Sequence, residues 1–111
     1  MATELTKDAD KLVCLIYKEY LSRRKSGLAK RQAKDFVEEN DWPDSFSKEF
    51  SEDDMLDTLR ELKSAGFVKQ YIHGGFTLED ACIIYMENRF PNGLSQVLDW
   101  LGKIKGAIPF A

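Results

Sequence analysis

Apolar residues recur at helical spacing in five stretches of this chain, and polar or helix-breaking residues separate the stretches. Ser51 and Asp54 have the spacing of a capping box at the start of the third stretch. Thr77 and Asp80 have the same spacing before the fourth. The periodicity predicts helices over about 6–24, 30–40, 51–65, 79–89 and 94–108.

A change of period after the third helix predicts a β-hairpin. Gly66 is expected to end that helix in the left-handed conformation, and 67–72 has the composition of a strand. Gly74 and Gly75 can supply the positive φ angles of a tight turn, and 76–78 returns as the second strand. The pattern therefore predicts an α+β fold, predominantly helical, with a short β-hairpin.

The stretch between the second and third helices is expected to be irregular, because Pro43 prevents a helix from continuing. Its aromatic residues Trp42, Phe46 and Phe50 are expected to fold back onto the core. We also expect a short strand at 28–29, just after the first helix.

The segment SEDDMLDTLRELKSAGFV, residues 51–68, resembles the third helix and first wing strand of the winged helix-turn-helix superfamily. It has a capped start, leucines three apart, and a glycine before a β run. The chain is also similar to small uncharacterised winged-helix proteins of bacterial and phage genomes, in which segments similar to IYKEYLSRRKSGLAKRQAK and IIYMENRF recur. The length of 111 residues fits a single domain over 1–111. The resemblance implies a winged-helix core at about 9–78 and two extra C-terminal helices at about 79–108.

In DNA-binding members of the fold, the third helix lies in the major groove and the wing touches the backbone. The resemblance therefore implies a wing tip at His73, Gly74 and Gly75. Of the implied groove-facing residues, only Arg60 is of a type that commonly reads base edges. Those groove-facing residues are Glu52, Asp53, Asp57, Thr58, Arg60 and Glu61.

Charge is distributed in two blocks, although the net charge is only −3. Residues 18–34 hold seven basic residues and one acid, whereas 35–62 hold eleven acids and two basic residues. Two interpretations of the basic block stay open: it binds phosphates, or it pairs with neighbouring acids of the same chain. The phosphate-binding candidates are Arg23, Arg24, Lys25, Lys30, Arg31 and Lys34; the acids available for pairing are Asp35, Glu38, Glu39 and Asp41.

Two functional hypotheses follow. The first is a non-enzymatic, regulator-like module that contacts double-stranded DNA mainly through phosphates, with Arg60 as the base reader and His73 as a wing contact. The alternative is a protein-interaction module, in which the acidic third helix docks on a basic protein partner without DNA binding. No catalytic constellation, metal-ligand spacing or cofactor motif is present. Cys14 and Cys82 are expected to be buried free thiols.

The last predicted helix has a strongly apolar stripe, which must be covered either by another part of this chain or by a second chain. It either folds back onto the first helix or pairs with its counterpart in a homodimer, and we expect the homodimer. No apolar run approaches about 18 residues and the first residues are charged, so we expect a cytoplasmic protein with no membrane span. The stripe consists of Leu94, Val97, Leu98, Leu101, Ile104 and Ile108.

Overall fold

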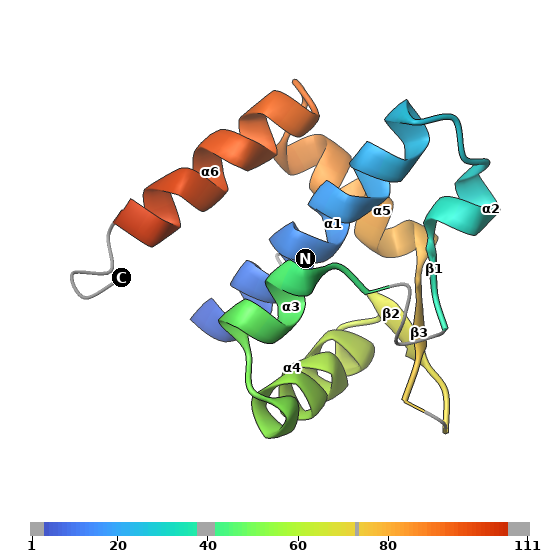
Figure 1. Ribbon diagram of the computed structural model, residues 1–111, viewed down its shortest axis with the longest axis vertical. Coiled ribbons are helices and arrows are strands. Elements are labelled where there is room, and N and C mark those ends of the chain that lie inside the picture. Colours follow the sequence, from blue (N-terminus) through green and yellow to red (C-terminus); the bar gives the residue numbers. More distant parts are fainter. Residues whose placement is uncertain (1–3, 38–41, 73, 107–111) are drawn as a thin grey trace.

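The structure, a computed structural model, describes residues 4–37, 42–72 and 74–106. Helix α1 (Lys7–Lys25) is central to the arrangement (Figure 1). Thr6 caps α1 by accepting a hydrogen bond from the backbone N–H of Ala9. Asp8 and Asp10 lie in its first turn, where the helix dipole favours negative charge. The predicted first helix and its cap are confirmed.

The segment after α1 differs from the prediction. Helix α2 (Lys30–Ala33) has only four residues, and the chain then forms strand β1 (Asp35–Phe36). The strand expected at 28–29 is wrong, because that stretch leads directly into α2. Long-range pairing outweighs the helical period here, since the carbonyl of Lys34 accepts a hydrogen bond of 2.9 Å from the backbone N–H of Leu78.

Helices α3 and α4 follow. Helix α3 (Asp44–Glu49) begins directly after Pro43, so the expectation of an irregular chain is wrong. Proline is tolerated at a helix start, where no hydrogen bond from its nitrogen is needed. Helix α4 (Glu52–Ser64) is capped by Ser51, whose hydroxyl accepts a hydrogen bond of 3.2 Å from the backbone N–H of Asp54. The predicted start of this helix is confirmed.

Three short antiparallel strands form one sheet in the order β1-β3-β2. The chain leaves α4 through Gly66, which has a φ of 81°, and forms β2 (Val68–Gln70) and then β3 (Phe76–Leu78). Phe76 of β3 pairs with Phe36 of β1, and their rings stack with centroids 4.9 Å apart. The predicted hairpin is confirmed, and β1 adds a third strand that the sequence did not indicate at this position.

The two glycines of the hairpin are needed for different reasons. Gly74 has a φ of 99°, which side chains rarely allow. Gly75 has no positive φ, so that expectation is wrong for it. A Cβ atom at Gly75 would instead collide with the backbone carbonyl of Val37. Gly75 therefore permits a close approach of two chain segments.

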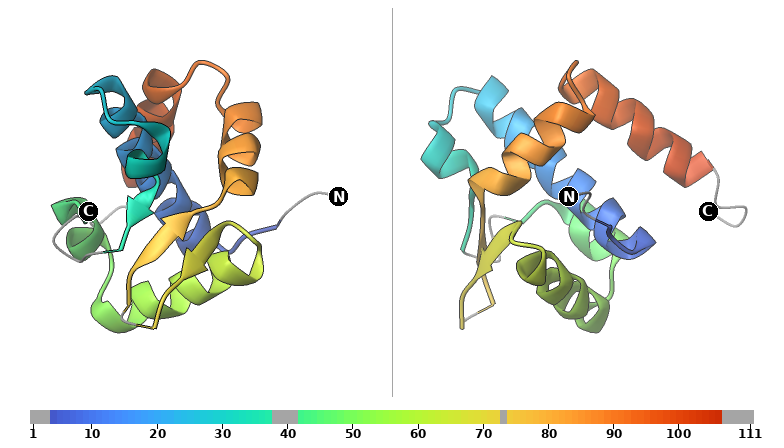
Figure 2. Two further views of the ribbon diagram at one scale, coloured as in Figure 1. Left: turned by 90° about the vertical axis from the view of Figure 1, so that its right-hand side faces the viewer. Right: turned by 180° about the vertical axis from the view of Figure 1, so that it is seen from behind.

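Helices α5 (Asp80–Arg89) and α6 (Leu94–Gly106) complete the fold. The views from the side and from behind show α6 running beside α1 (Figure 2). The predicted capping pair of Thr77 and Asp80 is wrong. Thr77 lies inside β3, where its hydroxyl is hydrogen-bonded to the hydroxyl of Tyr71 at 3.0 Å.

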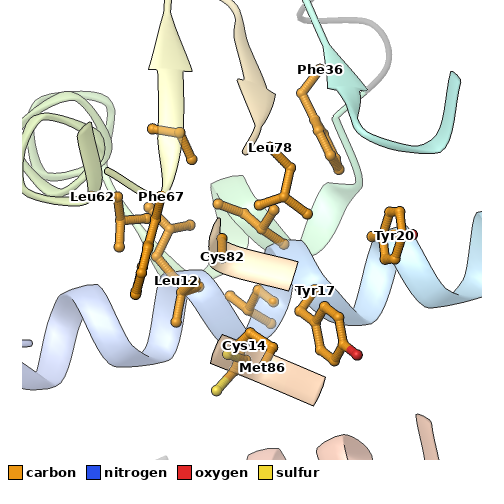
Figure 3. Packing of buried hydrophobic residues seen from close by; sticks show 14 of the residues in the cluster. Leu12, Cys14, Tyr17, Tyr20, Phe36, Leu62, Phe67, Leu78, Cys82 and Met86 are labelled. Carbon is orange, nitrogen blue, oxygen red and sulfur yellow. The ribbon is translucent and has the colours of Figure 1, made fainter. Parts of the chain in front are cut away.

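The core is built around the middle of α1, where residues 12–17 are all buried. Because α4, α5 and the sheet pack against this segment, their outward faces are fixed relative to one another. Both thiols are buried, as predicted. Figure 3 shows side chains of α1 (Leu12, Cys14, Tyr17 and Tyr20) together with Phe36, Leu62, Phe67, Leu78, Cys82 and Met86.

Candidate interaction surfaces

The first two turns of α4 present carboxylates to solvent. Glu52, Asp53, Asp54 and Asp57 are all exposed, and we call them the α4 acidic face. Helical periodicity separates them from the apolar side of the helix, which packs on the core. Three of the four acids lie in the first turn, where the helix dipole stabilises negative charge. The buried side of the helix consists of Met55, Thr58, Leu59 and Leu62.

Two residues that the winged-helix resemblance placed on this outward face serve the fold instead. Thr58 is buried, and its hydroxyl donates a hydrogen bond of 2.6 Å to the carbonyl of Asp54. Glu61 accepts hydrogen bonds from the backbone N–H and the hydroxyl of Thr6, at 2.9 and 2.7 Å. The predicted groove-facing role is therefore wrong for Thr58, and Glu61 ties α4 to the start of α1.

A groove of about 390 Å³ opens beside the α4 acidic face, between α3 and the start of α4. We call it the α3–α4 groove. Asp44 and Glu52 contribute carboxylates to its lining. Its apolar lining consists of Trp42, Phe46, Phe50, Met55 and Leu56.

The groove has a fixed wall and floor. Phe46, Phe50 and Met55 are buried, whereas Trp42 and Leu56 are half-buried. The indole N–H of Trp42 donates a hydrogen bond of 2.8 Å to the carbonyl of Phe36, which holds the indole in place. Sequence reasoning missed this groove because it did not predict α3. The four-residue spacing of Trp42, Phe46 and Phe50, which is helical, is the signal that could have revealed it.

Cations gather around the junction of α1 and α2, and we call this surface the basic corner. In Figures 1 and 2 it lies at the opposite end of the molecule from α4. Within the described parts of the chain, neither Lys25 nor Arg31 forms an ion pair, and both are exposed. The basic corner consists of Arg24, Lys25, Lys30, Arg31 and Lys34.

An acid from a distant helix partly neutralises the basic corner. The Nζ atoms of Lys34 and Lys30 lie 2.9 and 3.6 Å from the Oδ1 atom of Asp80. The hydrogen bond from Lys34, together with the two positive charges, holds the pKa of Asp80 below its usual value. Internal pairing therefore occurs, but with α5 rather than with Asp35. The other acids considered, Glu38, Glu39 and Asp41, lie outside the described residues.

Arg23, predicted as a phosphate contact, is built into the fold. Its guanidinium donates hydrogen bonds to the carboxylate of Glu19 at 3.0 Å and to the carbonyl of Asp35 at 2.8 Å. The guanidinium carbon also lies 4.2 Å from the centre of the Phe36 ring. Only 12% of the side chain is exposed, so little of it can reach a ligand.

The remaining predicted contacts lie apart from the basic corner. Arg60 is exposed on α4, and its guanidinium lies 3.6 Å from the carboxylate of Asp57 one turn earlier. His73 lies outside the described residues. The structure therefore does not bring Arg60 together with the cations of the basic corner.

The predicted apolar stripe of α6 divides into two parts. Val97 and Leu101 are buried in the core of this chain, whereas Leu98 is 46% exposed and Leu94 is half-buried. Arg89 at the end of α5 helps to hold α6, because its guanidinium lies 5.0 Å from the Trp100 ring and is also paired with Asp10. Packing of α6 onto its own chain therefore covers Val97 and Leu101 of the stripe. The side chain of Ile104 and the whole of Ile108 lie outside the described part.

Within residues 4–37, 42–72 and 74–106, no group of three or more histidine, cysteine or acidic side chains is placed to hold a metal ion. In the same ranges, no helix has the length and apolar character needed to cross a membrane. Comparison with protein-family models, curated proteins and solved structures found no match.

Proposed function

We propose that this chain is a non-enzymatic winged helix-turn-helix module, acting in the cytoplasm, whose α4 acidic face docks on a basic protein partner. The order of elements supports the fold assignment, because α4 is followed at once by the β2–β3 hairpin, in the place of a wing. The strand order β1-β3-β2 supports it further, since β1, from before α3, pairs with the returning strand of that hairpin.

The charge of α4 opposes a standard approach to DNA. One carboxylate about 7 Å from a phosphate is repelled by about 0.6 kcal/mol in water, and by about four times that at an effective dielectric constant near 20. Four exposed acids near several phosphates would therefore cost several kcal/mol, comparable with the roughly 5–8 kcal/mol of non-specific DNA binding. The compensating cations lie at the opposite end of the molecule.

The observation that carries the proposal is the location of four exposed carboxylates beside a preformed apolar groove. Complementary charge speeds encounter and orients a partner, whereas buried apolar contacts supply most of the affinity. A partner that presents lysine or arginine around an apolar patch matches both features. The same surface repels an acidic partner.

The test measures binding of a labelled lysine-rich peptide by fluorescence anisotropy at low and high salt. Replacing Asp53 and Asp57 together by asparagine should weaken binding roughly tenfold at low salt, because each removed charge pair is worth up to about 1 kcal/mol at an exposed site. The matched control removes two exposed acids elsewhere, Glu87→Gln on α5 and Asp99→Asn on α6, and should change the affinity little. Equal affinity of the Asp53/Asp57 variant and the unmodified protein contradicts the proposal.

A second candidate function, DNA contact through phosphates, is supported by the exposed cations Lys25 and Arg31 of the basic corner. Such binding would weaken steeply as salt rises, because phosphate neutralisation releases counterions. Charge reversal at both residues should then abolish the anisotropy change of a labelled duplex. The same substitutions should leave lysine-peptide binding unchanged, which separates the two candidate functions.

A further inference from the structure

We infer that the α3–α4 groove receives one large apolar side chain, leucine or larger, from a partner segment that carries lysine or arginine on both sides of that residue. The inference rests on the proposed function and specifies the chemistry of the partner. Burial of the apolar side chain in the groove would supply most of the affinity, and the surrounding carboxylates would orient the partner segment.

The shape of the groove supports an apolar anchor. Its volume of about 390 Å³ lies near the lower end of the roughly 300–1,000 Å³ that ligand pockets span. Its floor is apolar, because Phe46, Phe50 and Met55 are each no more than 7% exposed. The half-buried Trp42 and Leu56 still offer apolar surface that a ligand can cover. Interface hot spots are commonly anchors seated in such desolvated pockets.

Preorganisation supports the same conclusion. The Trp42 ring is fixed by its hydrogen bond to Phe36 and by packing against Phe46 and Phe76, at centroid distances of 6.1 and 5.6 Å. Because these groups are already ordered, little side-chain entropy is lost when a ligand enters.

The charges around the groove specify what flanks the anchor. Asp44 in the first turn of α3 and Glu52 in the first turn of α4 both line it. Asp53 and Asp57 extend the negative surface along α4. A cation on each side of the anchor would meet a carboxylate from a different helix, whereas acidic flanks would be repelled.

The experiment uses two lysine-rich peptides that differ only in a central leucine or alanine. Trp42 and Trp100 are the two tryptophans of the chain, so the substitution Trp100→Phe makes the fluorescence of Trp42 a reporter of the groove. The leucine peptide should bind roughly tenfold more tightly than the alanine peptide, as expected for burying a leucine side chain. It should also shift the emission of Trp42, whereas the alanine peptide should not.

Two variants block the groove from opposite walls. Leu56→Arg adds bulk and positive charge from α4, and Ser47→Arg does so from α3, where Ser47 is exposed. Either variant should remove the preference for leucine, and thermal unfolding checks that it still folds. Ile84→Arg is the matched control, because Ile84 is an exposed apolar residue of α5 that does not line the groove. It should retain the preference.

The possible failures are distinguishable. Equal affinity for the two peptides, with binding still dependent on Asp53 and Asp57, overturns the groove inference and leaves the proposed function intact. A leucine preference that survives both blocking variants overturns the inference as well, since the anchor then lies elsewhere. Equally tight binding of a neutral leucine peptide overturns the assigned role of the cations. If neither lysine-rich peptide binds, both the proposed function and the inference fail.

Discussion

Replacement of Arg23 by alanine should destabilise the fold, although sequence reasoning placed this residue among surface cations. Its guanidinium bonds to Glu19 and to the Asp35 carbonyl and stacks on Phe36. Hydrogen bonds to charged groups contribute about 1.5–3 kcal/mol each, and a cation–π contact about 0.5–2 kcal/mol. Because contacts of one side chain are not additive, we expect a total loss of about 3 kcal/mol.

Urea denaturation followed by circular dichroism measures this loss. About 3 kcal/mol corresponds to a fall in Tm of roughly 10–20 °C for a chain of this size. Arg23→Lys should recover little, because an ammonium lacks the planar fork that reaches both acceptors and the ring. Lys25→Ala and Arg31→Ala remove exposed cations from the same region and should each change stability by less than about 0.5 kcal/mol. The reasoning is refuted if Arg23→Ala is as stable as these two controls.

Three further perturbations test the packing. Gly75→Ala should destabilise by more than about 2 kcal/mol in urea denaturation, because its new methyl group collides with the backbone of Val37; a neutral effect would contradict this contact. Val97→Ala should cost about 2 kcal/mol if α6 is held on α1 by this fully buried residue, and unchanged stability would show that α6 is not docked. Burial raises the pKa of Cys14 and of Cys82 to about 12, so both thiols should be inert to disulfide reagents near neutral pH until the protein unfolds. Rapid labelling of the native protein would contradict the burial of the thiols. Since unfolded thiols ionise near pH 9, the free energy of unfolding should fall as pH rises from about 9 to 12, by up to about 1.4 kcal/mol per pH unit for each thiol.

The elements that the sequence predicted well have local causes. Helix α1 and helix α4 are each marked by a capping hydroxyl, Thr6 or Ser51, followed by apolar residues at helical spacing. Gly66 and Gly74 follow the same logic, because a left-handed backbone conformation at one position requires a particular residue there. Such signals need no knowledge of distant parts of the chain.

Residues 30–37 and 42–50 were predicted poorly because their structure depends on distant partners. An aromatic residue at 36 fits either a helix face or a strand, and pairing with Phe76, forty residues later, selects the strand. A four-residue helix such as α2 is unstable alone, since nucleation costs more than so few hydrogen bonds return. Pairing across the sheet supplies the stability that the local helix propensity of this segment lacks.

The candidate surfaces also divide into features with local causes and features that depend on distant residues. The winged-helix resemblance placed Asp53 and Asp57 on the outward face of α4, where both are exposed. The sequence could not predict that Asp80 would reach Lys34, because that contact joins the residue after α2 to α5, 46 residues later. The buried role of Arg23 was likewise hidden, since its acceptors include a strand that the period did not reveal.

The adjacency of the two charge blocks in the sequence left open whether they neutralise one another, and the fold places the α4 acidic face far from the basic corner. Strand β1 carries the chain from the basic corner toward α3 and α4, so the α4 acidic face lies at the opposite end of the molecule from the basic corner (Figures 1 and 2). The molecule extends 32–35 Å along its principal axes, several times the Debye length of about 8 Å at physiological ionic strength. Each end therefore presents its own field to a partner, and the basic corner does little to cancel the carboxylates of α4. The proposed docking at α4 and the proposed phosphate contact at the basic corner should consequently be independent, so substitutions at one end should act additively with substitutions at the other.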